Sequence, residues 1–170
     1  MRELAAFLEE EKVAYFGVAY ADEGVALRKA GILSPIVVMN PEPAAFDDII
    51  DFELEPSIYA PDLLNRFIHQ LIIRRQSHFP IHLKLDTGMN RLGFRSEQLK
   101  ELLETLAAQP EVYLKSVFSH LSVADDLNER GYTAGQLDRF KQMTAEIKQS
   151  LGYSFLRHVA HSAGAFNFPE

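Results

Sequence analysis

The sequence has no cysteine among its 170 residues. This absence excludes disulfides and thiolate metal sites. We predict no other metal site, and we expect a cytoplasmic location. The chain also lacks a basic N-terminal stretch followed by an apolar core, so we predict no signal peptide. Its longest apolar runs are too short to span a bilayer, and we predict no membrane association.

Basic residues are fewer than acidic ones, 17 against 24, and the net charge is −7. An acidic balance argues against a nucleic-acid partner. The hydrophobic fraction of 47% and the aromatic fraction of 11% are ample for a packed core and exclude a disordered chain. The length corresponds to one domain, residues 1–170.

Short strand patterns alternate with helical patterns along the whole chain. Strands are predicted at 15–19, 36–39, 57–59, 81–86, 116–121 and 157–162. Helices are predicted at 2–11, 22–31, 46–52, 97–108 and 134–151, with a further long helix that begins at Pro61 and ends before Pro80. This alternation predicts an α/β fold with a parallel sheet and helical crossovers.

Residues 80–94 are the most informative run in the chain. A short strand places three aliphatic side chains on one face and the ionisable His82, Lys84 and Asp86 on the other. Buried ionisable groups are costly unless they are paired or used, so Lys84 would need a partner, a chemical modification or a depressed pKa. Charged residues at the end of a strand, followed by a glycine-rich loop with Arg91, are typical of a (β/α)-barrel active site.

This run resembles, nearly residue for residue, a signature of the alanine racemases, which are pyridoxal-phosphate enzymes with a TIM-type (β/α) barrel. The resemblance implies that Lys84 is carbamylated and holds Arg91, and that Arg91 lies against the cofactor's phenolic oxygen and the substrate carboxylate. We predict that Lys84 lies within reach of Arg91 and is carbamylated or paired with Asp86, since two buried cations would repel each other.

Three further segments carry the resemblance. Residues 16–32 are similar to the family's second strand and the helix after it. Residues 117–125 resemble the next signature, in which His120 corresponds to a histidine near the pyridoxal ring. Residues 157–165 resemble the seventh-strand signature, in which Ser162 matches a serine that contacts phosphate and His161 replaces a usual asparagine. Small residues and a hydroxyl after a strand also suit phosphate.

These matches define the predicted site. Lys84, Arg91 and His120 are predicted as catalytic residues, and Arg91, His120, His161 and Ser162 as ligands of pyridoxal 5'-phosphate. The resemblance implies that the chain holds about strands 2–7 of eight, an incomplete barrel from a larger polypeptide. The cofactor-bearing lysine, the tyrosine base, the strand-eight arginine and a C-terminal β-domain are expected outside it.

The predicted function is therefore a part of an alanine racemase that interconverts L- and D-alanine for cell-wall peptide synthesis. The part is expected to be inactive alone and the intact enzyme to be a homodimer. Because an open barrel has two bare edges, we expect a second copy or a rearranged terminus to cover them. Two alternatives stay open: a racemase of the same barrel class acting on other amino acids, and an inert domain for association or regulation.

Overall fold

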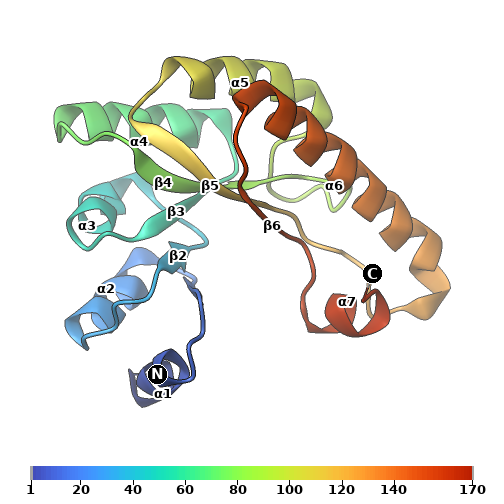
Figure 1. Cartoon of the computed structure of the whole chain (residues 1–170), viewed down its shortest axis with the longest axis horizontal. Coiled ribbons are helices and arrows are strands. Elements are labelled where there is room, and N and C mark those ends of the chain that lie inside the picture. The colour runs from blue at the N-terminus through green and yellow to red at the C-terminus, as the bar shows by residue number, and fades with distance from the viewer. Residues whose placement is uncertain (1, 170) are drawn as a thin grey trace.

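Six parallel strands form one curled sheet, an open half-barrel, in the computed structural model, which describes residues 2–169 (Figure 1). Each strand pairs with the next one along the chain. In order they are β1 Phe16–Val18, β2 Ile36–Val38, β3 Glu55–Ile58, β4 Phe79–Lys84, β5 Val112–Phe118 and β6 Leu156–His158. The predicted fold class, an incomplete parallel (β/α) barrel, is confirmed.

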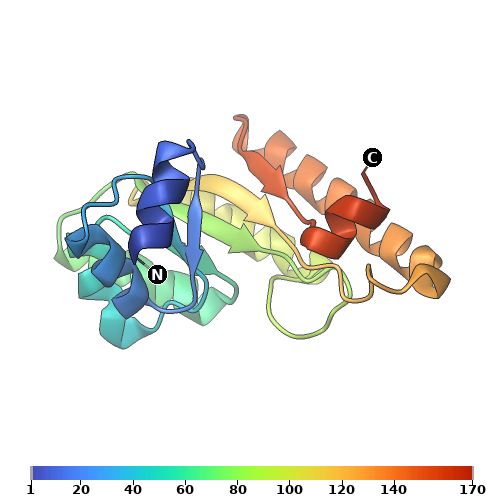
Figure 2. The ribbon, with the colours of Figure 1, turned by 90° about the horizontal axis from the view of Figure 1, so that it is seen from below.

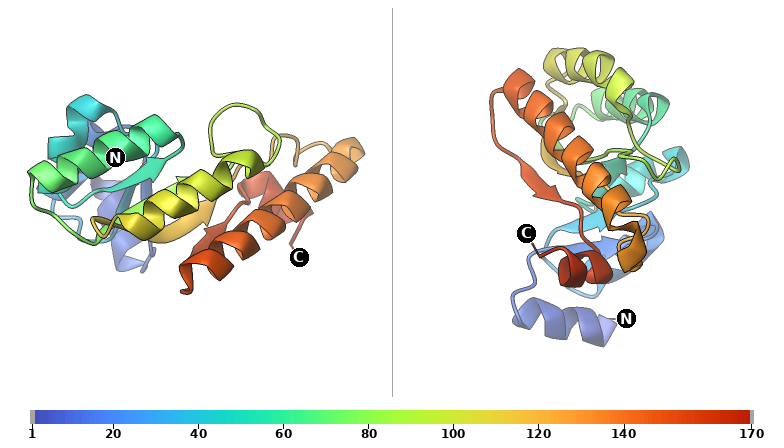
Figure 3. Two further views of the ribbon diagram at one scale, coloured as in Figure 1. Left: turned by 90° about the horizontal axis from the view of Figure 1, so that it is seen from above. Right: turned by 90° about the vertical axis from the view of Figure 1, so that its right-hand side faces the viewer.

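Helices make the crossovers between the strands, and α4, α5 and α6 lie side by side along one face of the sheet (Figure 3). The α-helices are α1 Arg2–Glu10, α2 Ala21–Lys29, α3 Phe46–Asp51, α4 Pro61–Ile73, α5 Leu99–Ala108, α6 Arg130–Leu151 and α7 Ser162–Asn167. Short 3-10 turns are η1 Pro43–Ala45, η2 Ser96–Gln98 and η3 Leu127–Glu129. Within residues 2–169, no helix is both long and apolar enough to cross a membrane.

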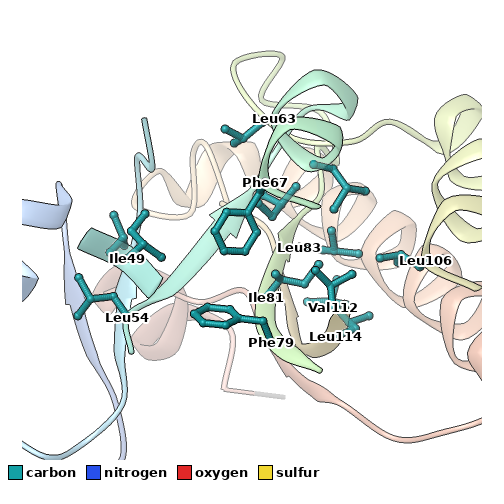
Figure 4. Close-up of a cluster of buried hydrophobic side chains, with 14 of the residues drawn as sticks. Ile49, Leu54, Leu63, Phe67, Phe79, Ile81, Leu83, Leu106, Val112 and Leu114 are labelled. Atoms are coloured by element: carbon teal, nitrogen blue, oxygen red, sulfur yellow. The ribbon is translucent and has the colours of Figure 1, made fainter. Parts of the chain in front are cut away.

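The hydrophobic core lies between the sheet and these outer helices. Ile81 and Leu83 of β4 are fully buried and belong to one cluster with Phe67 of α4 and Leu106 of α5 (Figure 4). The alternate residues of β4, His82 and Lys84, are also buried, but they face the interior of the curl. The two-faced strand predicted from the sequence is therefore present.

The structure confirms that α4 ends before Pro80 and corrects the predicted start of β4. The helix ends at Ile73, well before Pro80, because Arg75 and His78 adopt left-handed backbone conformations with φ of 54° and 57°. Pro80 itself lies inside β4. A proline is tolerated there because β3 pairs with β4 only from His82 onward, so the missing N–H removes no bond on that side.

The C-terminal boundaries also differ from those predicted. β5 begins at Val112 and ends at Phe118, so His120 lies in the following loop and not in the strand. β6 ends at His158, and the predicted strand over 157–162 is wrong beyond that residue. Residues 162–167 form α7, which the sequence pattern did not indicate; Gly164 lets this helix pack closely on Leu121.

The two edge strands, β1 and β6, lie at opposite ends of the sheet (Figure 2). All three residues of β6 are exposed, whereas β4 at the centre is almost wholly buried. Within residues 2–169 no terminal segment pairs with either edge. Coverage by a second copy of the chain stays a prediction.

Candidate active site at the carboxyl ends of the strands

Lys84, the last residue of β4, is buried beside Phe118, its register partner on β5. Its Nζ lies 5.8 Å from the centroid of the Phe118 ring. Burial lowers the pKa of Lys84, the positive charge of Arg91 lowers it further, and Asp86 partly opposes both. A lysine in this setting has more of its neutral, nucleophilic amine than an exposed lysine has.

The loop after β4 folds back on the strand that it leaves. Asp86 donates its backbone N–H to Phe94 O, and Phe94 donates its N–H to Lys84 O, both over 2.9 Å. The Asp86 carboxylate accepts the backbone N–H groups of Gly88 and Asn90 through Oδ1 at 3.0 Å. This carboxylate organises the loop and forms no ion pair with Lys84, so one of the two predicted states of Lys84, the pair with Asp86, is not formed, and its carbamylation stays a prediction.

Gly93 is required where the loop returns to the strand. Its φ is +130°, and a Cβ atom there would lie 2.6 Å from the backbone of Leu85 and of Asp86. Only glycine tolerates both conditions. The loop presents Arg91, whose side chain is exposed and whose charge reaches both Lys84 and His120.

Helix α6 holds the same loop from outside, a contact that the sequence pattern did not predict. The Tyr132 hydroxyl donates to Gly88 O over 2.6 Å, and Arg139 Nε donates to Thr87 O over 2.6 Å. No local signal could have revealed these bonds, since they join residues 44 and 52 positions apart. Arg91 therefore belongs to a loop fixed at both its base and its outer side.

His120 and His161 bring the loops after β5 and β6 together. Their ring centroids lie 5.1 Å apart, and His161 donates Nε2–H to Leu121 O over 3.0 Å. Burial lowers the pKa of His120, and the nearby His161, Arg91 and Lys84 lower it further. Four of the five predicted site residues thus share one electrostatic neighbourhood.

Ser162, the fifth predicted residue, begins α7 directly after His161. Its side chain is exposed, and its hydroxyl makes no hydrogen bond with another residue that the structure describes. The hydroxyl is therefore available to a ligand near His161.

The donor chemistry of this cluster suits an anionic ligand. Lysine, arginine, imidazole and a hydroxyl meet at the carboxyl ends of parallel strands, where barrels place their active sites. A cavity of about 360 Å³ lies beside the loop, and Arg91, Arg95, Asp86 and Tyr59 are among its lining residues. Pyridoxal phosphate, which has a phenolic oxygen and a phosphate, fits this set of groups.

A larger cavity of about 580 Å³ lies at the other end of the strands, where Glu55, Phe79 and Pro80 are among the residues that line it. None of the predicted site residues borders it. Since chemistry in parallel barrels is concentrated at the carboxyl ends of the strands, the smaller cavity is the one that belongs to the candidate site.

Comparison with known families gives a match over residues 1–170 to the family described as "Alanine racemase, N-terminal domain". The chain belongs to this family. The alanine racemase of Sorangium cellulosum is 33% identical over 170 residues, which are 98% of this chain and 45% of that protein. The alanine racemase of a Nostoc species is 36% identical over 158 residues, 91% of this chain and 40% of that protein.

Solved structures of alanine racemases share the fold. The enzyme of Clostridium difficile 630 in complex with cycloserine superposes with a TM-score of 0.91 at 28% identity, over 99% of this chain and 46% of that one. The enzyme of the D-cycloserine producer Streptomyces lavendulae gives a TM-score of 0.83 at 28% identity, over 92% and 42% of the two chains. The chain therefore spans less than half the length of these relatives.

Proposed function

We propose that this chain forms part of the active-site barrel of an alanine racemase that interconverts L- and D-alanine with pyridoxal 5'-phosphate. The observation that carries the proposal is the meeting of Lys84, Arg91, His120 and His161 at the carboxyl ends of neighbouring strands, in a member of the alanine racemase family. Each group is suited to a part of the cofactor or of an amino-acid substrate.

Bound pyridoxal phosphate would supply the electron-withdrawing group that makes the α-proton of an amino acid removable. Arg91, as a guanidinium with paired donors, would bind the phenolic oxygen and the substrate carboxylate. The loop contacts of Asp86, Tyr132 and Arg139 hold the backbone beside Arg91, which limits how far the guanidinium can drift from its target.

Lys84 would act on Arg91 as a carbamate. The ammonium first loses one proton, and the neutral amine then adds to carbon dioxide and loses a second, so that a buried cation becomes a buried anion. The carbamate then attracts the Arg91 guanidinium that the ammonium repels. The lowered pKa of Lys84 favours this step because it increases the fraction of free amine.

His120 and Ser162 would complete the polar wall around the cofactor. The lowered pKa keeps His120 neutral near pH 7, so its ring can both donate and accept a hydrogen bond. The free hydroxyl of Ser162 would donate to the phosphate. His161 already uses Nε2 on Leu121 O, which leaves only Nδ1 for the cofactor.

We propose further that the 170-residue chain does not racemise alanine by itself, and that the intact protein is a cytoplasmic homodimer that serves cell-wall synthesis. The support is coverage, since the chain matches 40–45% of the two curated relatives, and both bases of a two-sided proton transfer are needed for turnover. We propose in the same way that residues 1–170 form part of the N-terminal barrel domain of a longer protein.

The test adds pyridoxal phosphate to the chain, followed by borohydride reduction, mass mapping and a coupled D-alanine assay. We expect no stoichiometric attachment to any lysine and no turnover. Attachment at one defined lysine together with turnover would contradict the proposal that the cofactor-bearing lysine lies outside this chain. In parallel, ¹³C-bicarbonate should give a carbamate carbon signal that Lys84→Gln abolishes and Lys115→Gln leaves in place.

The two alternatives predict other results. A racemase for other amino acids would show, in the intact protein, turnover of serine or lysine above that of alanine. An inert association domain would show no turnover, and its parent gene would lack the cofactor lysine and the β-domain.

A further inference from the structure

A row of polar side chains, separate from the candidate site residues, crosses the interior of the sheet from three buried residues to an exposed histidine on the edge strand. Glu55, His82, Ser116 and His158 come one each from β3, β4, β5 and β6. His82 Nε2 lies 2.6 Å from Glu55 Oε2, and His82 Nδ1 lies 2.6 Å from Ser116 Oγ. Ser116 Oγ in turn lies 3.2 Å from His158 Nε2. Each of these four side chains therefore contacts the next one across neighbouring strands, and we refer to the four residues as the relay.

The direction of these hydrogen bonds is set at Glu55. An ionised carboxylate only accepts hydrogen bonds. The Lys115 ammonium lies close by: burial lowers the pKa of Lys115, but attraction to Tyr113, Tyr15 and Glu55 raises it overall. With Glu55 ionised and the His82 ring neutral, the condition of the test below, His82 donates Nε2–H to Glu55 and keeps Nδ1 as an acceptor.

The remaining bonds follow from that choice. Ser116 must donate its only hydroxyl proton to His82 Nδ1, so its oxygen accepts from His158 Nε2–H. Partial burial of its ring against the sheet lowers the pKa of His158, which favours the neutral ring. Its Nδ1 then carries a lone pair and has no hydrogen-bond partner within residues 2–169.

We infer that Glu55, acting through His82 and Ser116, fixes the Nε2–H tautomer of His158 and so presents Nδ1 on the edge strand as a hydrogen-bond acceptor. Glu55, His82 and Ser116 are positioning residues, since only His158 would touch the donor. If the chain of bonds ran the other way, Ser116 would donate to His158 Nε2 and the proton would sit on Nδ1. The tautomer of His158 therefore reports the direction. The inference concerns this chain alone and does not depend on the proposed racemase activity.

The test is ¹⁵N–¹H correlation spectroscopy of the histidine rings in the whole ¹⁵N-labelled chain, at a pH where the rings are neutral. We expect His82 and His158 as single Nε2–H tautomers. Ser116→Ala should leave His158 as a mixture of tautomers, and Ser116→Thr, which keeps the hydroxyl, should restore the single form. Glu55→Gln should shift the His158 ring signals although the two side chains do not touch.

Controls separate the relay from a general disturbance of the fold. Glu53→Gln changes an exposed carboxylate near Glu55 and should leave His158 unchanged, and the exposed His69 should give the same ring signals in every variant. An Nδ1–H tautomer of His158 in the unaltered chain would overturn the inference without any variant. Unchanged His158 signals in Glu55→Gln or in Ser116→Ala would also overturn it.

Discussion

The loop that carries Arg91 and the segment that carries His161 and Ser162 belong to one candidate site but are held in different ways. The Arg91 loop leaves β4, a central strand paired on both sides. It closes on its own base through Asp86 and is held from outside by Tyr132 and Arg139 of α6. The structure therefore fixes this half of the site within the chain itself.

The second half rests on β6, an exposed edge strand with a single neighbour. Beyond β6, His161 donates to Leu121 O, and Asn167 Nδ2 donates to Ala124 O over 2.8 Å. These contacts tie the segment to the loop after β5, and the Arg130 guanidinium at the start of α6 lies 5.4 Å from the centroid of the Phe168 ring. The difference teaches that the chain itself fixes the half of the site that carries Arg91, whereas the half that carries His161 and Ser162 has fewer supports within the described residues.

The largest contrast should come from removing a leucine from each strand. Leu83→Ala in β4 deletes a fully buried side chain and should lower the free energy of unfolding by about 2–5 kcal/mol. Leu156→Ala in β6, where the side chain is 53% exposed, should cost less than about 0.5 kcal/mol. Urea denaturation of both variants measures the difference. Equal losses would show that β6 is as firmly packed as β4.

Glycine replacement should separate the two halves next. Gly93→Ala should cost about 3 kcal/mol, because it combines a forbidden φ with a backbone clash. In Gly164→Ala the added carbon would lie 3.1 Å from the movable Leu121 Cδ1, and the cost should be smaller. Unfolding curves give the cost, and the Arg91 amide resonance should move only in Gly93→Ala. A tolerated Gly93→Ala would mean that the loop is not fixed at its base.

The pH dependence of stability tests the burial of Lys84. Its pKa in the folded chain lies below the ordinary value of 10.5, so the unfolded chain binds more protons between the two values. The buried ammonium therefore destabilises the fold at neutral pH, and the penalty disappears as the pH rises through this window. The stability advantage of Lys84→Met over the unaltered chain should shrink as the pH approaches 10.5.

That measurement belongs in buffer free of carbon dioxide, so that no carbamate forms. Lys100→Met, which replaces an exposed lysine on α5, is the matched control and should show no such trend over the same range. A Lys84→Met advantage that stays constant up to pH 10.5 would place the Lys84 ammonium in water.

The smallest effects should come from single hydrogen bonds. Tyr132→Phe removes the bond to Gly88 O and should cost about 0.5–1.5 kcal/mol, with faster amide hydrogen exchange at Gly88 and Asn90. Asn167→Ala should cost a similar amount but speed exchange in residues 161–167 instead. Faster exchange throughout the chain in either variant would mean that the two halves of the site open together.

The sequence predicted much of the candidate site because its signals are local. Alternation in 80–94 placed His82 and Lys84 on one face of a buried strand, and both are buried there. The sequence also indicated a glycine-rich loop after this strand, and Gly93 of that loop lies where the backbone returns to β4. The Tyr132 and Arg139 contacts, and the Glu55–His82–Ser116–His158 chain, gave no such signal, since they depend on which residues of distant elements face each other.

The sequence by itself determined the α/β class, the two-faced β4 and the family resemblance, because side-chain period and motif composition are properties of neighbouring residues. Only the tertiary structure decided that Asp86 serves its own loop and not Lys84, that Pro80 sits inside a strand, and that residues 162–167 form a helix. The Asp86 bonds are local and compete with Lys84 for the same carboxylate, whereas the other two depend on distant residues: Pro80 on where β3 pairs with β4, and the helix on Leu121 against Gly164. Which strands and side chains meet is decided by the packing of the curled sheet, and local preference only limits the choices.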